Sequence, residues 1–504
     1  MKTLSLIILL TSGFGIRWLR WLGLAQQKEY RLDRLKLFFQ SPDGQAEFKR
    51  LLPKRSDFSR TGLKRPKWTP RVLLIAGLSL GLIMSVYLIL SPILILDWFA
   101  PDSFQSILLK VIGWLVGIYL TLPIFVLLAI LPTSLVNWLA TESYLRQAKK
   151  IFDTHQPLVI GITGSFGKTS TKKLLTHLLG GPAQVYATPD SYNAKLSVAR
   201  SICQDYRGQK IAIIEYGAYA KNEIAQLASW IKPQQAIITG IAPQHLGLFG
   251  NVENLIKAKA ELVAALPNDG VVFYSSDQPE VEKLVKIGVV DRSLKQISFS
   301  KKGSHLVKIT SAGITEQGFL ECLVDGEIIK TKLVGEHYLL GLVGAVTVAL
   351  THGVKSEKVW VRVMNFQPDA HFIQIKFLTD GNLLIDDGGT SNPAGFASAI
   401  QLAERIPALK KILLTPGIID LGHQTGQIHE QLAEQAKTVF DQVMYLDTPG
   451  QTEFKAQFNQ KLISQPQQII KLLTELEAGT MLVVEGRIPA WLKPKIDQMT
   501  RHLA

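Results

Sequence analysis

Hydrophobic residues are distributed very unevenly along this chain. Residues 72–98 form an apolar run closed by Asp97, and residues 106–131 form a second run interrupted only by Lys110. Each run exceeds the roughly 20 residues that a helix needs to cross a bilayer. A helix buried in a soluble domain would keep a polar face, and neither run has one. The pattern therefore predicts two membrane-spanning helices.

The first 24 residues are also largely apolar, and Arg17, Trp18, Arg20 and Trp21 interrupt them. A cleaved signal peptide needs small residues after its apolar stretch, and here arginines and tryptophans follow instead. A short anchoring helix is the better interpretation. It would span the bilayer or lie in the interface, with the tryptophans at the headgroups.

After residue 157 the pattern changes to short apolar runs alternating with helical segments. The predicted strands are 157–162, 210–217 and 235–241, and the predicted helices start near 168, 223 and 254. Strands that alternate with helices predict a parallel sheet covered on both faces.

Two further changes of pattern follow in the second half of the chain. Residues 290–334 contain short alternating runs typical of antiparallel strands, followed by a helix at 338–351. From residue 382 the strand–helix rhythm resumes, which indicates a separate, smaller α/β domain.

The predicted fold class is α/β. N-terminal transmembrane helices precede a P-loop central domain, with a mostly parallel sheet plus a small antiparallel sheet, and a C-terminal Rossmann-like α/β domain. The expected domains are 1–150, 151–365 and 366–504.

The net charge of +14 on 504 residues suggests nucleic-acid binding until its location is considered. Residues 25–71 hold 13 Lys/Arg against 5 Asp/Glu and lie between apolar segments. Positively charged loops stay cytoplasmic, and this loop would attract anionic lipid headgroups. We therefore expect membrane lipids and not nucleic acid as partners, with 25–71 and everything after about residue 135 inside the cell.

Two cysteines, Cys203 and Cys322, occur without a CxxC spacing or a histidine partner. They predict neither a disulfide framework nor a zinc site, which suits a reducing compartment.

The segment Gly161–Thr169 (GITGSFGKT) lies between a predicted strand and a predicted helix. Glycines let backbone N–H groups converge on a phosphate, and the helix N-terminus adds partial positive charge. Lys168 can reach the β- and γ-phosphates, and the Thr169 hydroxyl can hold Mg²⁺. The glycine spacing differs from the standard Walker form, and an ordinary glycine-rich turn is the alternative interpretation.

Several motifs in order resemble those of the Mur ligases, which add amino acids or dipeptides to peptidoglycan precursors. They begin with the loop itself and with SYN at 191–193. Glu215 resembles the acidic magnesium ligand. The segment 238–262 resembles the D-alanyl-D-alanine-adding branch, with His245 as a second metal ligand and Lys259 as a lysine that is carbamylated.

Three later motifs extend the resemblance to the end of the chain. GEHYLL (335–340) resembles the segment leading to the third domain, and DDGGTSNP (386–393) and TPGIIDLG (415–422) resemble loops of that domain. From the residues alone, His245 can also be structural, Lys259 a solvated lysine, and Asp386 or Asp387 a helix cap.

The resemblance implies ATP and Mg²⁺ as cofactors and assigns the site residues. The catalytic residues are Lys168, Lys259, His245 and Asp387. The nucleotide-binding residues are Gly164, Ser165, Gly167, Lys168, Thr169, Ser170, Asn193 and His337. The magnesium ligands are Thr169, Glu215, His245 and Lys259.

Four positions depart from the family pattern. The adenine element appears as Ser275-Ser276-Asp277, an expected asparagine is Gly341, an expected tyrosine is Gly389, and 368–377 holds no arginine. The N-terminal domain that grips the UDP-sugar is replaced by apolar segments and a basic loop. These departures fit a divergent ligase or one that has lost activity.

The resemblance thus implies an ATP-dependent ligase that forms an amide through an acyl phosphate. The apolar segments and the basic loop, and not the resemblance, predict a location on the bacterial inner membrane with the catalytic domains facing the cytoplasm. Its acceptor would be a small-molecule or lipid-linked muropeptide, and its donor an amino acid or dipeptide. A folylpolyglutamate-type or poly-amino-acid ligase is an alternative within this chemistry. The amidating partner of a glutaminase is disfavoured because a cysteine-rich zinc insertion is missing.

Two hypotheses come from other classes of protein. A membrane scaffold that binds nucleotide without catalysis fits the four departures. A transport ATPase is disfavoured, because so few apolar helices supply few intramembrane polar groups for a pathway.

Overall fold

The computed structural model describes the chain except for residues 1, 41, 52–65, 97–103, 244–245, 379–380, 390, 420, 448, 490 and 501–504. It forms two compact units, Met1–Glu142 and Ser143–Ala504.

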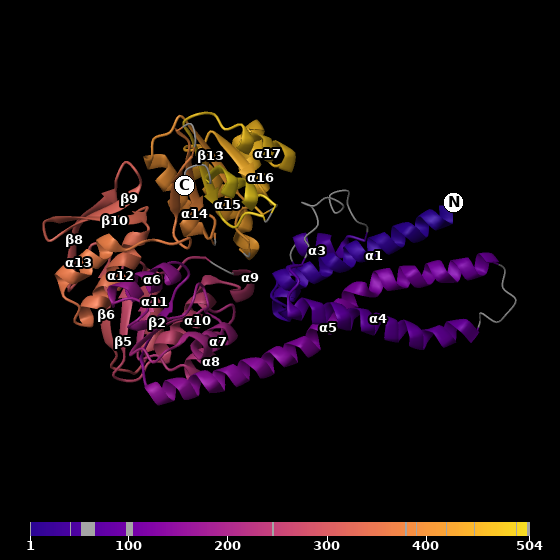
Figure 1. Cartoon of the computed structure of the whole chain (residues 1–504), viewed down its shortest axis with the longest axis horizontal. Coiled ribbons are helices and arrows are strands. Elements are labelled where there is room, and N and C mark those ends of the chain that lie inside the picture. The colour runs from indigo at the N-terminus through magenta and orange to yellow at the C-terminus, as the bar shows by residue number, and fades with distance from the viewer. Residues whose placement is uncertain are drawn as a thin grey trace. The chain divides into compact units, whose positions relative to one another are not determined.

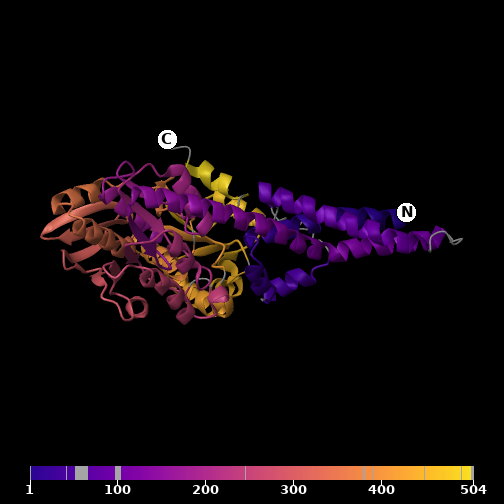
Figure 2. The same cartoon turned by 90° about the horizontal axis from the view of Figure 1, so that it is seen from below.

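The first unit is helical. Its helices are α1 (Lys2–Gln27), α2 (Leu32–Gln40), α3 (Pro42–Lys49), α4 (Pro70–Leu96) and the first part of α5 (Phe104–His155). The long helices lie alongside one another in both views (Figures 1 and 2). They share a core that includes Trp21, Ile75 and Ala129. Trp21, which was expected at the headgroups together with Trp18, is buried among these helices, and its depth in a membrane stays a prediction.

Two helices among the described residues are long and apolar enough to cross a membrane. These segments are Pro70–Ile89 and Ile112–His155, each with a mean hydropathy of 2.5. Length and composition alone give this result, and a buried core helix or a signal sequence can share both properties.

Helix α5 begins in the first unit and ends in the second. The second apolar run was expected to end at 131 and the first domain at 150. The helix continues without a break to His155, and the two units divide after Glu142. The domain bound at 150 stays a prediction. Leu145, Ala148 and Phe152 of α5 are buried in a core of the second unit.

The second unit contains a ten-stranded sheet in the order β10-β9-β8-β7-β6-β5-β4-β1-β3-β2. Its parallel strands are β1 (Leu158–Thr163), β2 (Val185–Ala187), β3 (Ile211–Glu215), β4 (Gln235–Ile238), β5 (Val271–Ser275) and β6 (Lys295–Ser300). The helices between them are α6 (Lys168–Leu178), α7 (Lys195–Asp205), α8 (Glu223–Trp230), α9 (Leu246–Phe249), α10 (Val252–Ala264) and α11 (Pro279–Val289).

Alternate residues of the parallel strands enter two different cores. Ile160 and Ile162 of β1 belong to the core that also contains α6 and α12 (Tyr338–Thr351). Val159 belongs to the core that also contains α7, α8 and α10. Because side chains of a strand point alternately to the two faces, both faces of the sheet are covered and its strands are apolar throughout. The prediction of a parallel sheet between helices is confirmed.

A small antiparallel sheet was expected for 290–334. The antiparallel strands instead continue the ten-stranded sheet. They are β7 (Gly303–Ser304), β8 (Val307–Ile314), β9 (Phe319–Val324) and β10 (Glu327–Val334). β6 pairs parallel with β5 and antiparallel with β7, so the strands extend the same sheet. The predicted small antiparallel sheet is therefore an extension of the parallel one.

A second sheet of six strands follows, in the order β11-β12-β16-β13-β14-β15. Its strands are β11 (Gln374–Phe377), β12 (Leu383–Asp387), β13 (Lys410–Thr415), β14 (Gln442–Tyr445), β15 (Leu462–Ile463) and β16 (Thr480–Glu485). The remaining helices are α13 (Ser356–Asn365), α14 (Pro393–Arg405), α15 (Thr425–Lys437), α16 (Gln451–Phe458), α17 (Pro466–Thr474) and α18 (Lys493–Thr500), with short 3-10 turns η3 (Gly422–Gln424) and η4 (Asn459–Lys461). The expected second α/β sheet is thus present, with one antiparallel edge strand, β11. That it forms a separate domain stays a prediction.

Candidate functional site

The glycine-rich loop lies at the carboxyl edge of the ten-stranded sheet, between β1 and α6. A Cβ atom on Gly164 would lie 2.0 Å from the Thr239 hydroxyl oxygen, so only glycine allows the loop to approach β4 this closely. The Thr239 hydroxyl donates to the carbonyl of Phe166 at 2.5 Å, and the Ser165 N–H donates to the carbonyl of Gly240 at 2.7 Å. The end of β4 therefore fixes the shape of the loop, a role for Thr239 that the sequence did not indicate.

Two lysines converge on one carbonyl oxygen of this loop. Lys168 Nζ, from the first turn of α6, and Lys259 Nζ, from α10, each donate to the Gly164 carbonyl at 2.8 Å. Lys259 is only 3% exposed. Burial, and next the neighbouring Lys168 ammonium, lower the pKa of the Lys259 amine well below its ordinary value, against the attraction of Glu215. Burial also lowers the pKa of Lys168.

Glu215, the last residue of β3, is the central carboxylate of the site. Its Oε2 accepts hydrogen bonds from the Thr169 hydroxyl at 3.0 Å and from Lys172 Nζ at 3.1 Å. Its Oε1 accepts from Asn193 Nδ2 at 3.2 Å. Lys172 was missed in the sequence, although it lies four residues after Lys168 and hence on the same face of α6.

The segment 191–193 also contacts this carboxylate, through Asn193. The Gly217 N–H donates to the Asn193 carbonyl at 3.0 Å, and a Cβ on Gly217 would lie 2.6 Å from Asn193 Cγ. The Ser191 hydroxyl lies 3.4 Å from that of Thr169. These side chains form one cluster, although they are dispersed in the sequence: Thr169, Asn193, Glu215 and the two lysines that contact the loop, Lys168 and Lys259.

The charges of this cluster suit a polyphosphate. Three lysines, at 168, 172 and 259, interact electrostatically with the single carboxylate of Glu215. The buried hydroxyl of Ser165 has no hydrogen-bond partner in the described part of the chain, which leaves it available to a phosphate oxygen. Together with the loop and the α6 N-terminus, these groups fit the β- and γ-phosphates of ATP.

The donor set also fits Mg²⁺, provided that phosphate oxygens complete it. Thr169 and Glu215 supply a hydroxyl and a carboxylate, the oxygen ligands that Mg²⁺ prefers. Among the described residues, no group of three or more His, Cys, Asp and Glu side chains could hold a metal ion. Mg²⁺ commonly binds through one or two carboxylates and substrate phosphates.

Other predicted site residues are not brought to this cluster by any recorded contact. His245 lies outside the described residues. The Ser170 hydroxyl donates to the Gly167 carbonyl at 3.1 Å. His337 precedes α12, where burial and the nearby Lys301 lower its pKa to about 4, so it is neutral at physiological pH. The nucleotide-binding role of Ser170 and His337 stays a prediction.

Asp387 lies in the second sheet, beside a carboxyl group that the sequence did not indicate. It pairs in register with Glu485 of the adjacent strand β16. Burial raises the pKa of both groups, that of Asp387 to about 6 and that of Glu485 well above its ordinary value. The Ser391 hydroxyl donates to Glu485 Oε1 at 2.5 Å. Because the pKa of Glu485 is raised further, Glu485 keeps its proton to higher pH than Asp387 does.

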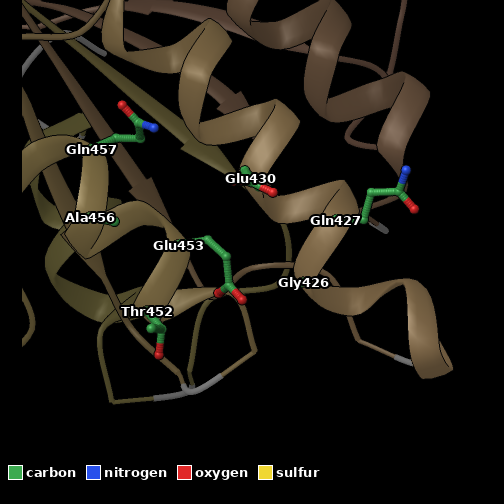
Figure 3. Close-up of a pocket in the computed structure, with 7 residues that line it drawn as sticks. All are labelled: Gly426, Gln427, Glu430, Thr452, Glu453, Ala456 and Gln457. Atoms are coloured by element: carbon green, nitrogen blue, oxygen red, sulfur yellow. The ribbon is translucent and has the colours of Figure 1, made fainter.

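A hollow of about 460 Å³ opens elsewhere, between α15 and α16 (Figure 3). Glu430 and Glu453 contribute its carboxylates. Because its lining holds no cation and no glycine-rich loop, it lacks the chemistry of a phosphate site.

The phosphate-loop part of the chain matches a known family. Residues 162–349 match the profile of the Mur ligase middle domain. This part of the chain is therefore similar to the Mur ligase middle domain, and the relatives and solved structures that it resembles include ligases of the MurF branch.

Among its relatives are UDP-N-acetylmuramoyl-tripeptide–D-alanyl-D-alanine ligases. That of Bacillus subtilis is 26% identical over 282 residues, and that of Mycobacterium tuberculosis H37Rv is 28% identical over 288. These matches cover 54% and 55% of this chain, which spans only 59% and 56% of the length of the two relatives.

Solved structures show the same fold. MurF from Acinetobacter baumannii has a TM-score of 0.63 at 21% identity, covering 72% of this chain and 80% of its own. MurF from Thermotoga maritima, solved in complex with ADP, has a TM-score of 0.62 at 23% identity, covering 72% and 83%. The fold resembles that of these MurF ligases over 72% of the chain.

The acid pair predicts a pH-dependent effect of Asp387→Asn on stability. A carboxyl whose pKa is raised on folding contributes stability that is complete below its unfolded pKa and is lost as pH rises through the folded value, here from about 4 to about 6. Relative to the wild type, Asp387→Asn should therefore gain thermal stability between pH 4.5 and pH 7.5.

Thermal unfolding of both proteins across this range measures the effect. Glu434→Gln, at an exposed position of α15, is the control and should follow the wild type. If the thermal stability of the wild type and of Asp387→Asn changed with pH in parallel, the raised pKa of Asp387 would be contradicted.

Proposed function

We propose that this protein is a membrane-anchored ligase that uses ATP to join a carboxylate and an amine, as an enzyme of the D-alanyl-D-alanine-adding type in peptidoglycan precursor synthesis. The acceptor carboxylate attacks the γ-phosphorus of ATP, which gives an acyl phosphate and ADP. The amine then attacks the acyl carbon, and phosphate leaves as the amide forms. The EC class is 6.3.2.

The observation that carries this proposal is the cluster of three lysines around Glu215 at the phosphate loop. Phosphoryl transfer needs little covalent help from the protein, and it depends on positioning and on neutralising charge. Lys168 would bind the transferred phosphoryl group. Mg²⁺, held by Thr169 and Glu215 with His245 and Lys259 as further candidates, would neutralise charge on the phosphates.

A nucleotide-binding scaffold without catalysis is the second candidate, and one observation favours it. The Asp277 carboxylate, at the position expected to help seat adenine, accepts a hydrogen bond from the Lys301 N–H at 2.8 Å. It therefore stabilises the turn after β6. A scaffold would bind nucleotide and release no ADP.

We expect Lys168→Ala to lower the rate of ADP release about a hundredfold or more, because it removes the positive charge that binds the transferred phosphoryl group. The assay measures ADP release by the full chain with ATP, over a panel of amines including D-Ala-D-Ala and of muropeptide acceptors. Lys173→Ala is the matched control, because the Lys173 side chain pairs with Asp369 and not with Glu215. Failure of the wild type with every pair would favour the scaffold.

Lys259 is proposed to act as a carbamate. The depressed pKa keeps much of its amine neutral, and a neutral amine attacks the carbon of CO₂ and loses a proton to form N-carboxylysine. The change replaces a group that repels cations by an anion beside Glu215. In this way a buried lysine becomes a candidate magnesium ligand.

Carbon-13 NMR of the protein equilibrated with labelled bicarbonate should show one carbamate resonance that disappears in Lys259→Ala. Lys257→Ala, on the same helix but with an exposed side chain, should retain it. A wild-type spectrum with no carbamate resonance would contradict the modification.

The membrane part of the proposal is supported by α4 and α5 and by the basic composition of 25–71. With this loop inside the cell, the second unit faces the cytoplasm of a bacterial inner membrane, and anionic lipids attract the loop. An active site held at the membrane would meet a lipid-linked acceptor directly. We therefore propose a lipid-linked muropeptide as acceptor, with a soluble one as the alternative.

The full chain should remain with membranes after alkaline washing, and in vesicles it should turn over lipid-linked acceptors faster than UDP-linked ones. Release of product from matched acceptors that differ only in the carrier measures the preference. Turnover confined to the soluble UDP-linked acceptor would refute the lipid-linked substrate, and extraction by the wash would refute the membrane anchor.

A further inference from the structure

Lys172 occupies a position that resembles the site of a metal ion. Its Nζ lies 3.1 Å from Glu215 Oε2 and 3.4 Å from the Thr188 hydroxyl, and it donates to the carbonyl of Asp190. A carboxylate, a carbonyl and a hydroxyl are the oxygen types that bind hard divalent cations. Lys172 and Glu215 are each 1% exposed, so the ammonium is enclosed by these ligands.

The carboxylate that Lys172 contacts has both oxygens engaged. Oε2 also accepts from Thr169, and Oε1 accepts from Asn193. A divalent ion that binds Glu215 must therefore replace a hydrogen bond or the ion pair. Lys168 also lies within electrostatic range of this carboxylate, so a metal ion approaching alone meets the positive charges of both Lys168 and Lys172.

Polyphosphate changes this balance. Its oxygens both neutralise the lysines and supply metal ligands, so the ion and the nucleotide favour each other's binding. The excess charge is greatest when the phosphates are missing. Lys172 is the only one of the three lysines that contacts Glu215 through a recorded hydrogen bond in the described part of the chain.

We propose that Lys172 is a positioning residue whose ammonium holds the cation position beside Glu215 in the nucleotide-free protein, so that a divalent ion binds there only together with nucleotide phosphates. The proposal rests on the proposed function to the extent that Glu215 is the metal ligand. It adds the reason why the ion and the nucleotide bind as a unit.

Mn²⁺ is the probe, and electron paramagnetic resonance of free Mn²⁺ measures its binding to the full chain in detergent without nucleotide. The wild type should bind weakly. Lys172→Gln, whose amide can still donate to the Asp190 carbonyl, should bind at least about tenfold more tightly, because a unit charge a few ångströms away is removed. ADP should reduce the difference between the two proteins.

Lys173→Gln is the matched control, since it removes the same charge at the next position, where the side chain pairs with Asp369. It should leave Mn²⁺ binding unchanged. Lys172→Arg, which keeps the charge, should bind Mn²⁺ as weakly as the wild type.

Two results would overturn the proposal. One is wild-type protein that binds Mn²⁺ as tightly without ADP as with it, a result that needs no variant to fold. The other is folded Lys172→Gln that binds Mn²⁺ no more tightly than wild type. The Mn²⁺ experiment measures binding and not turnover, so its outcome is independent of the ligase proposal. If Lys172→Gln bound Mn²⁺ more tightly but the wild type released no ADP, only the ligase proposal would be refuted.

Discussion

The arrangement of the phosphate site depends on one buried carboxylate, that of Glu215. It joins its own strand β3 to two segments that are distant in the sequence. Helix α6 supplies a hydroxyl and an ammonium, and the segment after β2 supplies an amide. A charge in such a buried position is tolerated only when it is paired and hydrogen-bonded. Removing one partner of a buried pair typically costs about 3–5 kcal/mol. The same contacts therefore stabilise the domain and set the geometry of its site.

The sequence was sufficient to predict what local chemistry determines. A strand, a glycine-rich turn with Lys168 and Thr169, and a helix occur in the predicted order, and the parallel strands are apolar because both of their faces are buried. Lys259 was identified through a resemblance, and the structure places it at the loop carbonyl.

Long-range pairing could not be predicted in the same way. The short alternating runs after residue 290 indicate antiparallel strands, but nothing in them shows that β6 pairs with β5 and so continues the first sheet. Glu485 ends a strand that is otherwise apolar, and its relation to Asp387 appears only when β16 is placed beside β12. Such pairs depend on the register of strands far apart in the chain. The roles of Lys172 and Thr239 were missed for the same reason, because their partners are not neighbours in sequence.

The continuity of α5 has a consequence for how the second unit can be separated from the first. Leu145, Ala148 and Phe152 belong to a helix whose earlier turns are among the most apolar of the chain, yet they are buried with the strands of the phosphate-loop domain. Each large apolar side chain removed from such a core costs about 1.5–3 kcal/mol. The boundary between the two units in the chain is thus not a loop but a point within a single helix. A soluble fragment that folds must keep the last turns of α5, and its new N-terminus would be a helix end that the intact protein never exposes.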